Sequence, residues 1–224
     1  MQRIALYDMD KTITARPTYS AFLVHAALRL APWRLLLAPL SALAGLAYML
    51  KLVSRTRLKE INLALLLGRP SLARLEPVIR DYARKVVTGN ILPGALDQIG
   101  RDRASGHRIV IATASFALYA KAIAEELGIA DVIATRLEEA KGGLLSNRVA
   151  GGNCYGETKL DMITEWLADN GIDRQSCSIT AYSDHVSDAP MLEFANVAVA
   201  ANPHDPLRQL AASRGWTIAD WRAG

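Results

Sequence analysis

The segment IALYDMDKTIT, residues 4–14, is the part of the sequence from which the fold can be inferred. The apolar run at residues 4–7 is typical of a buried strand, and Asp8 and Asp10 follow it directly. Residues two apart in an extended chain point to the same side, so the two carboxylates would repel each other unless a cation lay between them. By itself the segment fits equally well a turn or a helix N-cap with acidic residues.

Three distant segments favour the cation. A second apolar run, residues 108–112, ends in Thr-Ala-Ser at 113–115, and a third, residues 178–182, ends in SDHVSD at 183–188. Lys159 opens an amphipathic helix. Because the carboxyl ends of parallel strands share one edge of a sheet, these groups are expected to meet the first aspartate pair there. Such an edge would collect carboxylates for a divalent cation, with a hydroxyl and a lysine for an anion, which suits phosphoryl transfer.

This set of residues resembles the haloacid dehalogenase superfamily of phosphatases, specifically its phosphoserine-phosphatase-like branch. The four family motifs occur in order as DMDKT at 8–12, Thr113, Lys159 and SDHVSD at 183–188. Subsidiary matches are ILPGA at 91–95, CYGETK at 154–159 and DAPML at 188–192. The resemblance covers residues 1 to about 203. It implies a Mg²⁺-dependent phosphomonoester hydrolase that works through an aspartyl-phosphate intermediate.

The resemblance also assigns roles to individual residues. Asp8 would be the nucleophile and Asp10 the general acid and base, an order that the sequence alone cannot fix. Mg²⁺ would be held by Asp8, Asp184 and the main-chain carbonyl of Asp10. The phosphoryl oxygens would be bound by Thr113, Ala114 and Lys159. The residues expected to support these groups from behind are Thr12, Ser115, His185 and Asp188.

Some of these residues have simpler explanations. Outside the motifs, Thr113 would be an ordinary hydroxyl at a strand end and Ser115 a helix cap. Lys159 would be a solvated lysine, although a cation in the first turn of a helix opposes the helix dipole, which indicates a buried anion nearby.

Three positions depart from the family pattern. Lys11 stands where small residues are common, so that it either contacts the substrate or faces solvent. His185 follows Asp184 where Ser, Gly or Asn is more usual. Phosphoserine phosphatases carry a glutamate just past the first motif, which binds the amino group of the substrate. Residues 15–18, Ala-Arg-Pro-Thr, contain no acid, so we expect poor activity on phosphoserine.

Strands and helices alternate after residue 91, which predicts an α/β fold with a mainly parallel, doubly wound sheet of the Rossmann type. Residues 14–90 are helical in pattern and contain few strand signals. We therefore expect a catalytic core at residues 1–13 and 91–224 and an inserted helical cap at residues 14–90. In the family, an insert at this position covers the catalytic edge.

The cap is apolar and basic. From Lys11 to Lys59 there is no Asp or Glu, and residues 35–50 carry no charge at all. Sixteen helical residues span about 24 Å, less than the roughly 30 Å of a bilayer core, and Pro39 and Gly45 interrupt the run. A single membrane-spanning helix is therefore disfavoured. Two interpretations remain, a buried helix of the cap and an interfacial segment on an anionic membrane surface.

The leading functional hypothesis is hydrolysis of an amphiphilic or lipid phosphate, because the cap also resembles that of the membrane-associated phosphatidylglycerophosphate phosphatases. The alternatives are a soluble metabolite phosphatase, whose apolar cap is a packed bundle or a dimer surface, and a non-catalytic binding protein.

Nucleic acid is not expected as a partner, because the basic residues lack an aromatic stacking set. Cys154 and Cys177 form no disulfide framework, and the N-terminus lacks the pattern of a signal peptide. The expected location is cytoplasmic, with a peripheral position at the inner face of the membrane as the alternative.

Overall fold

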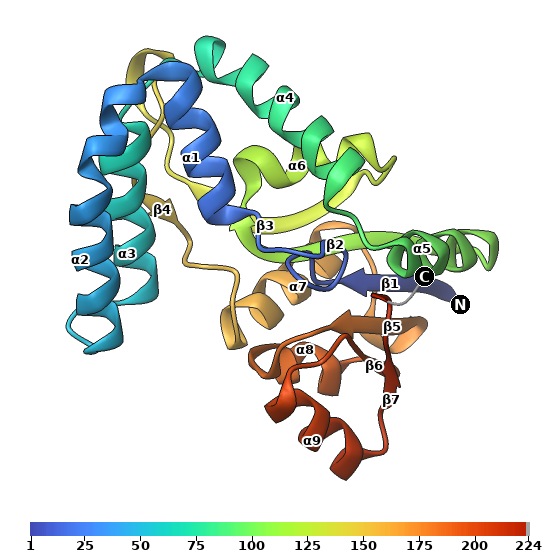
Figure 1. Cartoon of the computed structure of the whole chain (residues 1–224). Coiled ribbons are helices and arrows are strands. Elements are labelled where there is room, and N and C mark those ends of the chain that lie inside the picture. The colour runs from blue at the N-terminus through green and yellow to red at the C-terminus, as the bar shows by residue number, and fades with distance from the viewer. Residues whose placement is uncertain (223–224) are drawn as a thin grey trace.

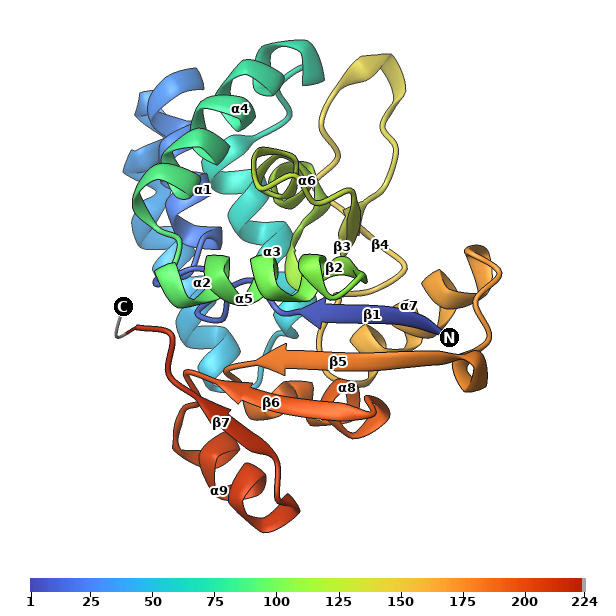
Figure 2. The same cartoon turned by 90° about the vertical axis from the view of Figure 1, so that its right-hand side faces the viewer.

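The sheet places the segment at residues 4–14 at the centre of the molecule. The structure is a computed structural model that describes residues 1–222. Its sheet has seven strands in the order β4-β3-β2-β1-β5-β6-β7, and only the β3–β4 pair is antiparallel (Figures 1 and 2). The strands are β1 Gln2–Tyr7, β2 His107–Phe116, β3 Asp131–Leu137, β4 Val149–Ala150, β5 Cys177–Ser183, β6 Val197–Ala201 and β7 Thr217–Ala219. The predicted fold class, a mainly parallel doubly wound sheet, is confirmed.

Helices cover both faces of this sheet, which explains the uninterrupted apolar run of the first strand. Ala5 and Tyr7 of β1 join one core cluster, and Ile4 and Leu6 join the other. The first cluster includes side chains of α5 Pro93–Ala104 and α6 Ala117–Glu126. The second includes side chains of α7 Glu157–Asp169, α8 Ala189–Phe194 and α9 Asp205–Arg214.

The helical insert leaves and rejoins the core at one place. Thr14 and Ile91 face each other in an antiparallel bridge, and the Leu92 N–H donates to the carbonyl of Ile13 at 2.9 Å. The helices between them are α1 Tyr19–Leu30, α2 Ala38–Met49, α3 Arg55–Asn62 and α4 Leu72–Gly89, with a 3₁₀ turn at Pro32–Leu37. They lie beyond the carboxyl end of β1 (Figure 1). The division into core and cap at residues 14–90 stays a prediction.

Two elements go beyond what the sequence pattern predicted. Helix α3 is followed by a π turn at Leu63–Leu67, which ends where Gly68 adopts a φ of 68°. Strand β7 was not predicted, because three residues are too few to show a periodicity. It extends the parallel sheet beside β6.

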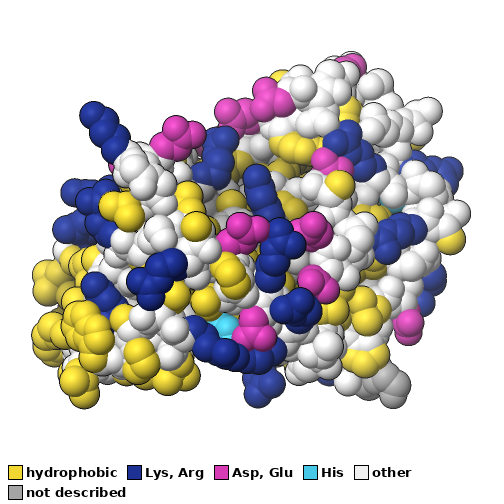
Figure 3. Space-filling view, turned by 90° about the horizontal axis from the view of Figure 1, so that it is seen from above, with side chains coloured by type: hydrophobic (Ala, Val, Ile, Leu, Met, Phe, Trp, Pro, Cys, Tyr) yellow, Lys and Arg dark blue, Asp and Glu magenta, His cyan; other side chains and the backbone are white. Residues whose placement is uncertain are grey.

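The uncharged run is exposed, so the interpretation of it as a buried helix is wrong for the chain as described. No residue of the 3₁₀ turn Pro32–Leu37 or of α2 is buried. Leu36 is 80% exposed and Met49 76%, and hydrophobic side chains gather at that edge of the molecule (Figure 3). Within residues 1–222, no helix combines the length and apolar character needed to cross a membrane.

Candidate active site

The segments singled out in the sequence line one cavity at the carboxyl ends of the central strands. Its volume is about 620 Å³, and nine of the ten predicted site residues line it together with Lys11. These residues are Asp8, Asp10, Lys11, Thr113, Ala114, Ser115, Lys159, Asp184, His185 and Asp188. Of the predicted site residues, only Thr12 does not line the cavity, although its hydroxyl lies close to two residues that do. Helices α1, α2 and α3 of the insert supply the opposite wall.

Lys159 holds two carboxylates from different strand ends. Its ammonium donates to Oδ1 of Asp8 and to Oδ2 of Asp188, both at 2.8 Å, and the lysine is 1% exposed. Asp188 also accepts a hydrogen bond from the Ser183 hydroxyl at 2.7 Å. The first turn of α7 can place this lysine inward because Gly156, directly before the helix, has a φ of 58°, which other residues rarely adopt. The buried anion inferred from Lys159's position is thus a pair of aspartates.

Burial and the neighbouring charges change the ionisation of these groups. Burial raises the pKa of Asp8 to about 8, against the lowering effect of Lys159, while Asp188 and Asp184 add to the rise. Burial alone would lower the pKa of Lys159, but Asp188 and Asp8 together raise it well above its usual range. The lysine is therefore a permanent cation, and Asp8 is a carboxylate that a further positive charge would stabilise.

The acidic groups fit a Mg²⁺ ion, although no three His, Cys, Asp or Glu side chains of residues 1–222 converge as a metal cluster. The Thr12 hydroxyl lies 3.4 Å from Oδ2 of Asp8 and 3.5 Å from Oδ1 of Asp184, so the two carboxylates approach one point. Burial, followed by the charge of Asp188, raises the pKa of Asp184 to about 6. Oδ1 of Asp188 is buried and has no hydrogen-bond partner among the described residues. Mg²⁺ binds few carboxylates and completes its shell with water and carbonyl oxygens, which suits this arrangement.

Asp10 makes no hydrogen bond to Lys159. It is held instead by Thr18 of the insert and Ser115 of the core. Its Oδ1 accepts hydrogen bonds from the Thr18 N–H at 2.7 Å and the Thr18 hydroxyl at 2.8 Å. Its Oδ2 accepts from the Ser115 hydroxyl, also at 2.8 Å. The Tyr119 hydroxyl in turn donates to Ser115. Thr18 was not predicted, since a threonine before a helix is ordinarily a cap, and only the folded chain brings it to Asp10.

Besides Ser115, the segment at 113–115 contributes the Thr113 hydroxyl and the Ala114 carbonyl to the site. The Thr113 hydroxyl accepts a hydrogen bond from the Ser115 N–H at 3.1 Å, which leaves its own proton free to donate. The Ala114 carbonyl accepts hydrogen bonds from the Thr135 hydroxyl at 2.8 Å and from the Lys59 ammonium. Lys59, like Thr18, was not among the predicted site residues.

The two unusual motif residues take different positions. His185 is exposed and stacks on His204 with 4.2 Å between ring centroids, and burial with the charge of His204 lowers its pKa. The ring on which it stacks, that of His204, lies with its Nδ1 2.9 Å from the Asp184 carbonyl. Lys11 is exposed, lines the cavity and has a φ of 64°, a left-handed conformation that is costly for a residue with a side chain.

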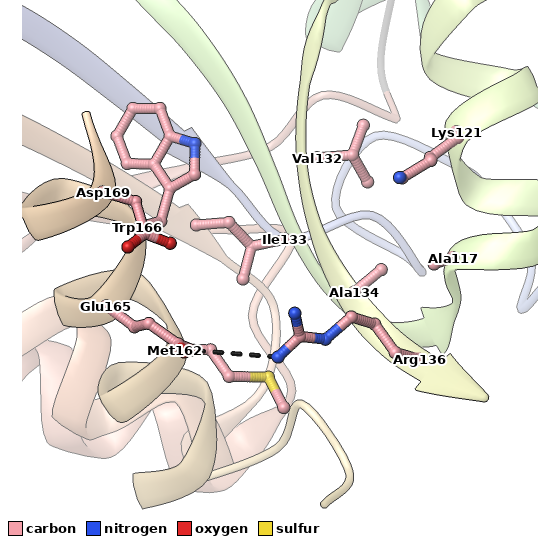
Figure 4. Close-up of a pocket in the computed structure, with 10 residues that line it drawn as sticks. All are labelled: Ala117, Lys121, Val132, Ile133, Ala134, Arg136, Met162, Glu165, Trp166 and Asp169. Carbon is pink, nitrogen blue, oxygen red and sulfur yellow. Dashed lines mark ion pairs between the residues drawn. The ribbon is translucent and has the colours of Figure 1, made fainter. Parts of the chain in front are cut away.

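A second, smaller cavity contains none of the predicted site residues. It lies between α6, β3 and α7 and has a volume of about 170 Å³ (Figure 4). Arg136 and Glu165 form an ion pair of 3.7 Å across it, and Trp166 lines one wall. Its polar groups resemble an ordinary solvated surface, so the chemistry is assigned to the larger cavity.

Comparison with known proteins agrees with this geometry. The family model of haloacid dehalogenase-like hydrolases matches residues 5–193. The chain belongs to this family. The probable phosphatase Rv3661 of Mycobacterium tuberculosis is 30% identical over 96% of this chain and 74% of its own length. Phosphoserine phosphatase SerB1 of the same organism is 31% identical over 71% of this chain and 51% of its own length.

A solved structure has the same fold along the whole chain. A protein of unknown function from Bordetella pertussis superposes with a TM-score of 0.88 and 26% identity, over 99% of both chains. The family prediction, a phosphoserine-phosphatase-like haloacid dehalogenase hydrolase, is confirmed by these matches. So is the prediction that the enzyme is a phosphatase. The resemblance of the cap to phosphatidylglycerophosphate phosphatases stays a prediction.

Proposed function

We propose that the protein hydrolyses phosphomonoesters with Mg²⁺ and forms a phosphoryl intermediate on Asp8. The observation that carries this proposal is that Asp8 and Asp10 have different surroundings. Asp8 is buried against Lys159 at 2.8 Å, whereas Asp10 is held separately by Thr18 and Ser115. A nucleophile and a proton donor need such different surroundings.

The proposed reaction uses these residues in two steps. The Asp8 carboxylate attacks phosphorus, the bond from phosphorus to the ester oxygen breaks, and Asp10 gives its proton to the departing alcohol. Water then attacks the phosphoryl group on Asp8 while Asp10 takes a proton from it, which releases phosphate and restores the Asp8 carboxylate. Thr113 would donate a hydrogen bond to the phosphoryl oxygens, and Lys159 would balance their charge.

A bound Mg²⁺ would supply positive charge against both the aspartates and the phosphoryl oxygens. Asp8, Asp184 and the carbonyl of Asp10 are the proposed ligands. Asp188, whose Oδ1 lacks a partner among residues 1–222, is proposed to hold a water of the metal shell. Ser183 fixes the other oxygen of Asp188 and so supports this position.

Phosphate release from a broad set of phosphomonoesters, with and without Mg²⁺, tests the proposal. Asp8→Asn should abolish turnover because an amide cannot form the intermediate, and acid quenching of the wild-type reaction should trap phosphate on the protein. Arg101→Gln, an exposed change in a side chain that hydrogen-bonds to Gln98 outside the cavity, serves as the control. Full activity of Asp8→Asn would refute the assignment of Asp8 as the nucleophile.

We propose further that the substrate is an amphiphilic phosphate, met at an anionic membrane surface. This part is supported by the exposed apolar side chains over residues 33–52 and by the absence of any acidic residue from Lys11 to Lys59. Lys51, between the exposed Leu50 and Leu52, is itself exposed, and an anionic lipid would attract it. The surface adjoins the cavity, because Tyr48 of α2 lines the cavity wall.

Flotation with liposomes separates this proposal from a soluble metabolite phosphatase. Anionic vesicles should carry the protein upward, and the double change Leu43→Glu with Leu46→Glu should abolish flotation, since both side chains are more than half exposed on α2. Leu96→Glu, at 46% exposure on α5, is the matched control. Absence of flotation, with faster hydrolysis of short-chain phosphates than of lipid phosphates, would favour the soluble alternative.

A further inference from the structure

A second buried lysine reaches the cavity from the insert, and none of the described residues gives it a carboxylate partner. Lys59 of α3 is 6% exposed, and its ammonium donates to the Ala114 carbonyl and to Oδ1 of Asn153 at 2.5 Å. Both acceptors are neutral. The third N–H of this ammonium has no acceptor among the described residues, and the lysine lines the cavity. Lys59 therefore differs from Lys159, whose charge is balanced by two aspartates.

Arg55 lies one turn earlier on the same helix and lines the same cavity. Its guanidinium carbon lies 3.9 Å from the centre of the Tyr155 ring, which fixes the group over an aromatic face. Within residues 1–222 no carboxylate oxygen lies within 4.0 Å of Arg55 or Lys59. Arg57, between them in sequence, faces outward and pairs with Glu60 at 3.0 Å. The unpaired charges are thus confined to the face of α3 that meets the cavity.

These two cations oppose each other in the absence of an anion. Burial, followed by the charge of Arg55, lowers the pKa of Lys59 to about 7. Asp10 is the carboxylate whose charge raises the pKa of Lys59 the most. Both of its oxygens already accept hydrogen bonds from Thr18 and Ser115. A negatively charged group that entered the cavity beside α3 would supply the missing counter-charge, with hydrogen bonds that both side chains can donate.

We propose that Arg55 and Lys59 form a subsite for a second anionic group, carried by the leaving-group part of the phosphomonoester. This proposal rests on the proposed function and narrows its substrate class to phosphomonoesters whose alcohol bears a carboxylate or a phosphodiester. An amine at the same place is disfavoured, because no acidic side chain lies on the insert side of the cavity. The subsite would thus reject phosphorylated amino alcohols and accept acidic ones.

A series of four short substrates isolates the charge of the leaving group. The probes are 4-phosphooxybutanoate, its neutral carboxamide, 4-aminobutyl phosphate and a propyl phosphate that ends in a methyl phosphodiester. Their alcohols differ little in reactivity, so kcat/KM reports binding of the distal group. We expect the better of the two anionic probes to exceed the carboxamide by about ten- to a hundredfold, the usual range for charge-assisted hydrogen bonds. The amine should be the poorest substrate, and the preferred anion identifies the source of the charge.

Variants assign the preference to residues. Lys59→Met and Arg55→Gln should each lower the ratio of kcat/KM for the preferred anion to that for the carboxamide, chiefly through KM. Arg57→Gln, which removes the same charge from the outward face of α3, should leave the ratio unchanged. The wild-type series alone tests the proposal if a variant does not fold, which a thermal melt would show.

The outcomes are distinct. Equal kcat/KM for anion, carboxamide and amine in the wild-type protein would refute the proposed anion subsite. It would leave the proposed phosphatase activity unaffected. Loss of activity in Lys59→Met by the same factor on every probe also overturns it, because Lys59 would then act on the reacting phosphoryl group. Failure of the wild-type protein to hydrolyse any probe or any phosphomonoester of the broad set would instead contradict the proposed function.

Discussion

The two buried lysines of the cavity should respond in opposite ways to the same substitution. Lys159→Met removes the one basic side chain of residues 1–222 that pairs with Asp8 and Asp188, each 2.8 Å from the ammonium. Two buried carboxylates are then left without a cation, which costs about 3–5 kcal/mol when one partner of a buried pair is deleted. We expect the lower end of this range, because Asp8, with a pKa already raised to about 8, can take up a proton instead.

Lys59→Met removes a buried charge that has only neutral acceptors. The Thr135 hydroxyl lies 2.8 Å from the Ala114 carbonyl and 3.0 Å from Oδ1 of Asn153, so one of the two acceptors keeps a donor after the change. Methionine fills most of the volume of the lysine side chain. Both hydrogen bonds of Lys59 are lost and one acceptor is left without a donor, at a cost of about 1–3 kcal/mol, which relief of the buried ammonium offsets. We therefore expect a stability within about 1 kcal/mol of the wild type, or above it.

Urea unfolding followed by circular dichroism at pH 7.5, in EDTA so that no metal compensates the carboxylates, measures both effects. The midpoint should fall strongly for Lys159→Met and stay or rise for Lys59→Met, with unchanged slopes. A Lys159→Met protein as stable as the wild type would refute the assigned ion-pair energetics. Equal destabilisation by both substitutions would show that burial of the stem, and not the carboxylate pairing, is what matters.

Three further predictions follow from the same contacts. Asp10→Asn should lower kcat by about 10²–10⁴-fold, with a smaller loss for aryl than for alkyl phosphates, because a good leaving group needs less protonation; equal losses would argue against an acid role. The folded protein holds the proton of Lys59 less tightly than the unfolded chain, since its pKa falls from 10.5 to about 7. The stability advantage of Lys59→Met should thus be complete below pH 7 and shrink as the pH rises above 7, and a gap that stays constant from pH 6 to pH 9 in urea titrations would contradict this. Asp102→Ala should cost about 2–3 kcal/mol in the same assay, because Tyr7 and Tyr182 donate to its Oδ2 at 2.5 and 2.9 Å; an unchanged midpoint would contradict this.

Much of the fold follows from local chemistry. The apolar run at residues 4–7 predicted a buried strand, and the sheet has it in the middle. The motif order placed Asp8, Thr113, Lys159 and Asp184 at strand ends and a helix start. Because parallel strands share their carboxyl edge, these positions imply one cavity, and the structure has all four around one.

Sequence patterns did not predict which parts of the helical insert are buried. Residues 35–50 are uncharged, and a pattern that is apolar on all sides does not say which neighbour covers it. Burial was one of the two interpretations kept, and the folded chain leaves the run exposed. Arg55 and Lys59 were visible in the sequence as members of a basic segment. Their four-residue spacing put them on one face of a helix, but not against any particular partner.

The sequence alone thus determined the family, the mainly parallel class of the sheet and the order of the motif residues, because these depend on strand periodicity and on residues adjacent in the chain. Only the tertiary structure decided which charges are paired. Lys159 meets two aspartates and Lys59 meets two neutral oxygens. Both are lysines on amphipathic helices. The difference arises from partners that lie 29 to 151 residues away in the sequence, whose position no local propensity encodes.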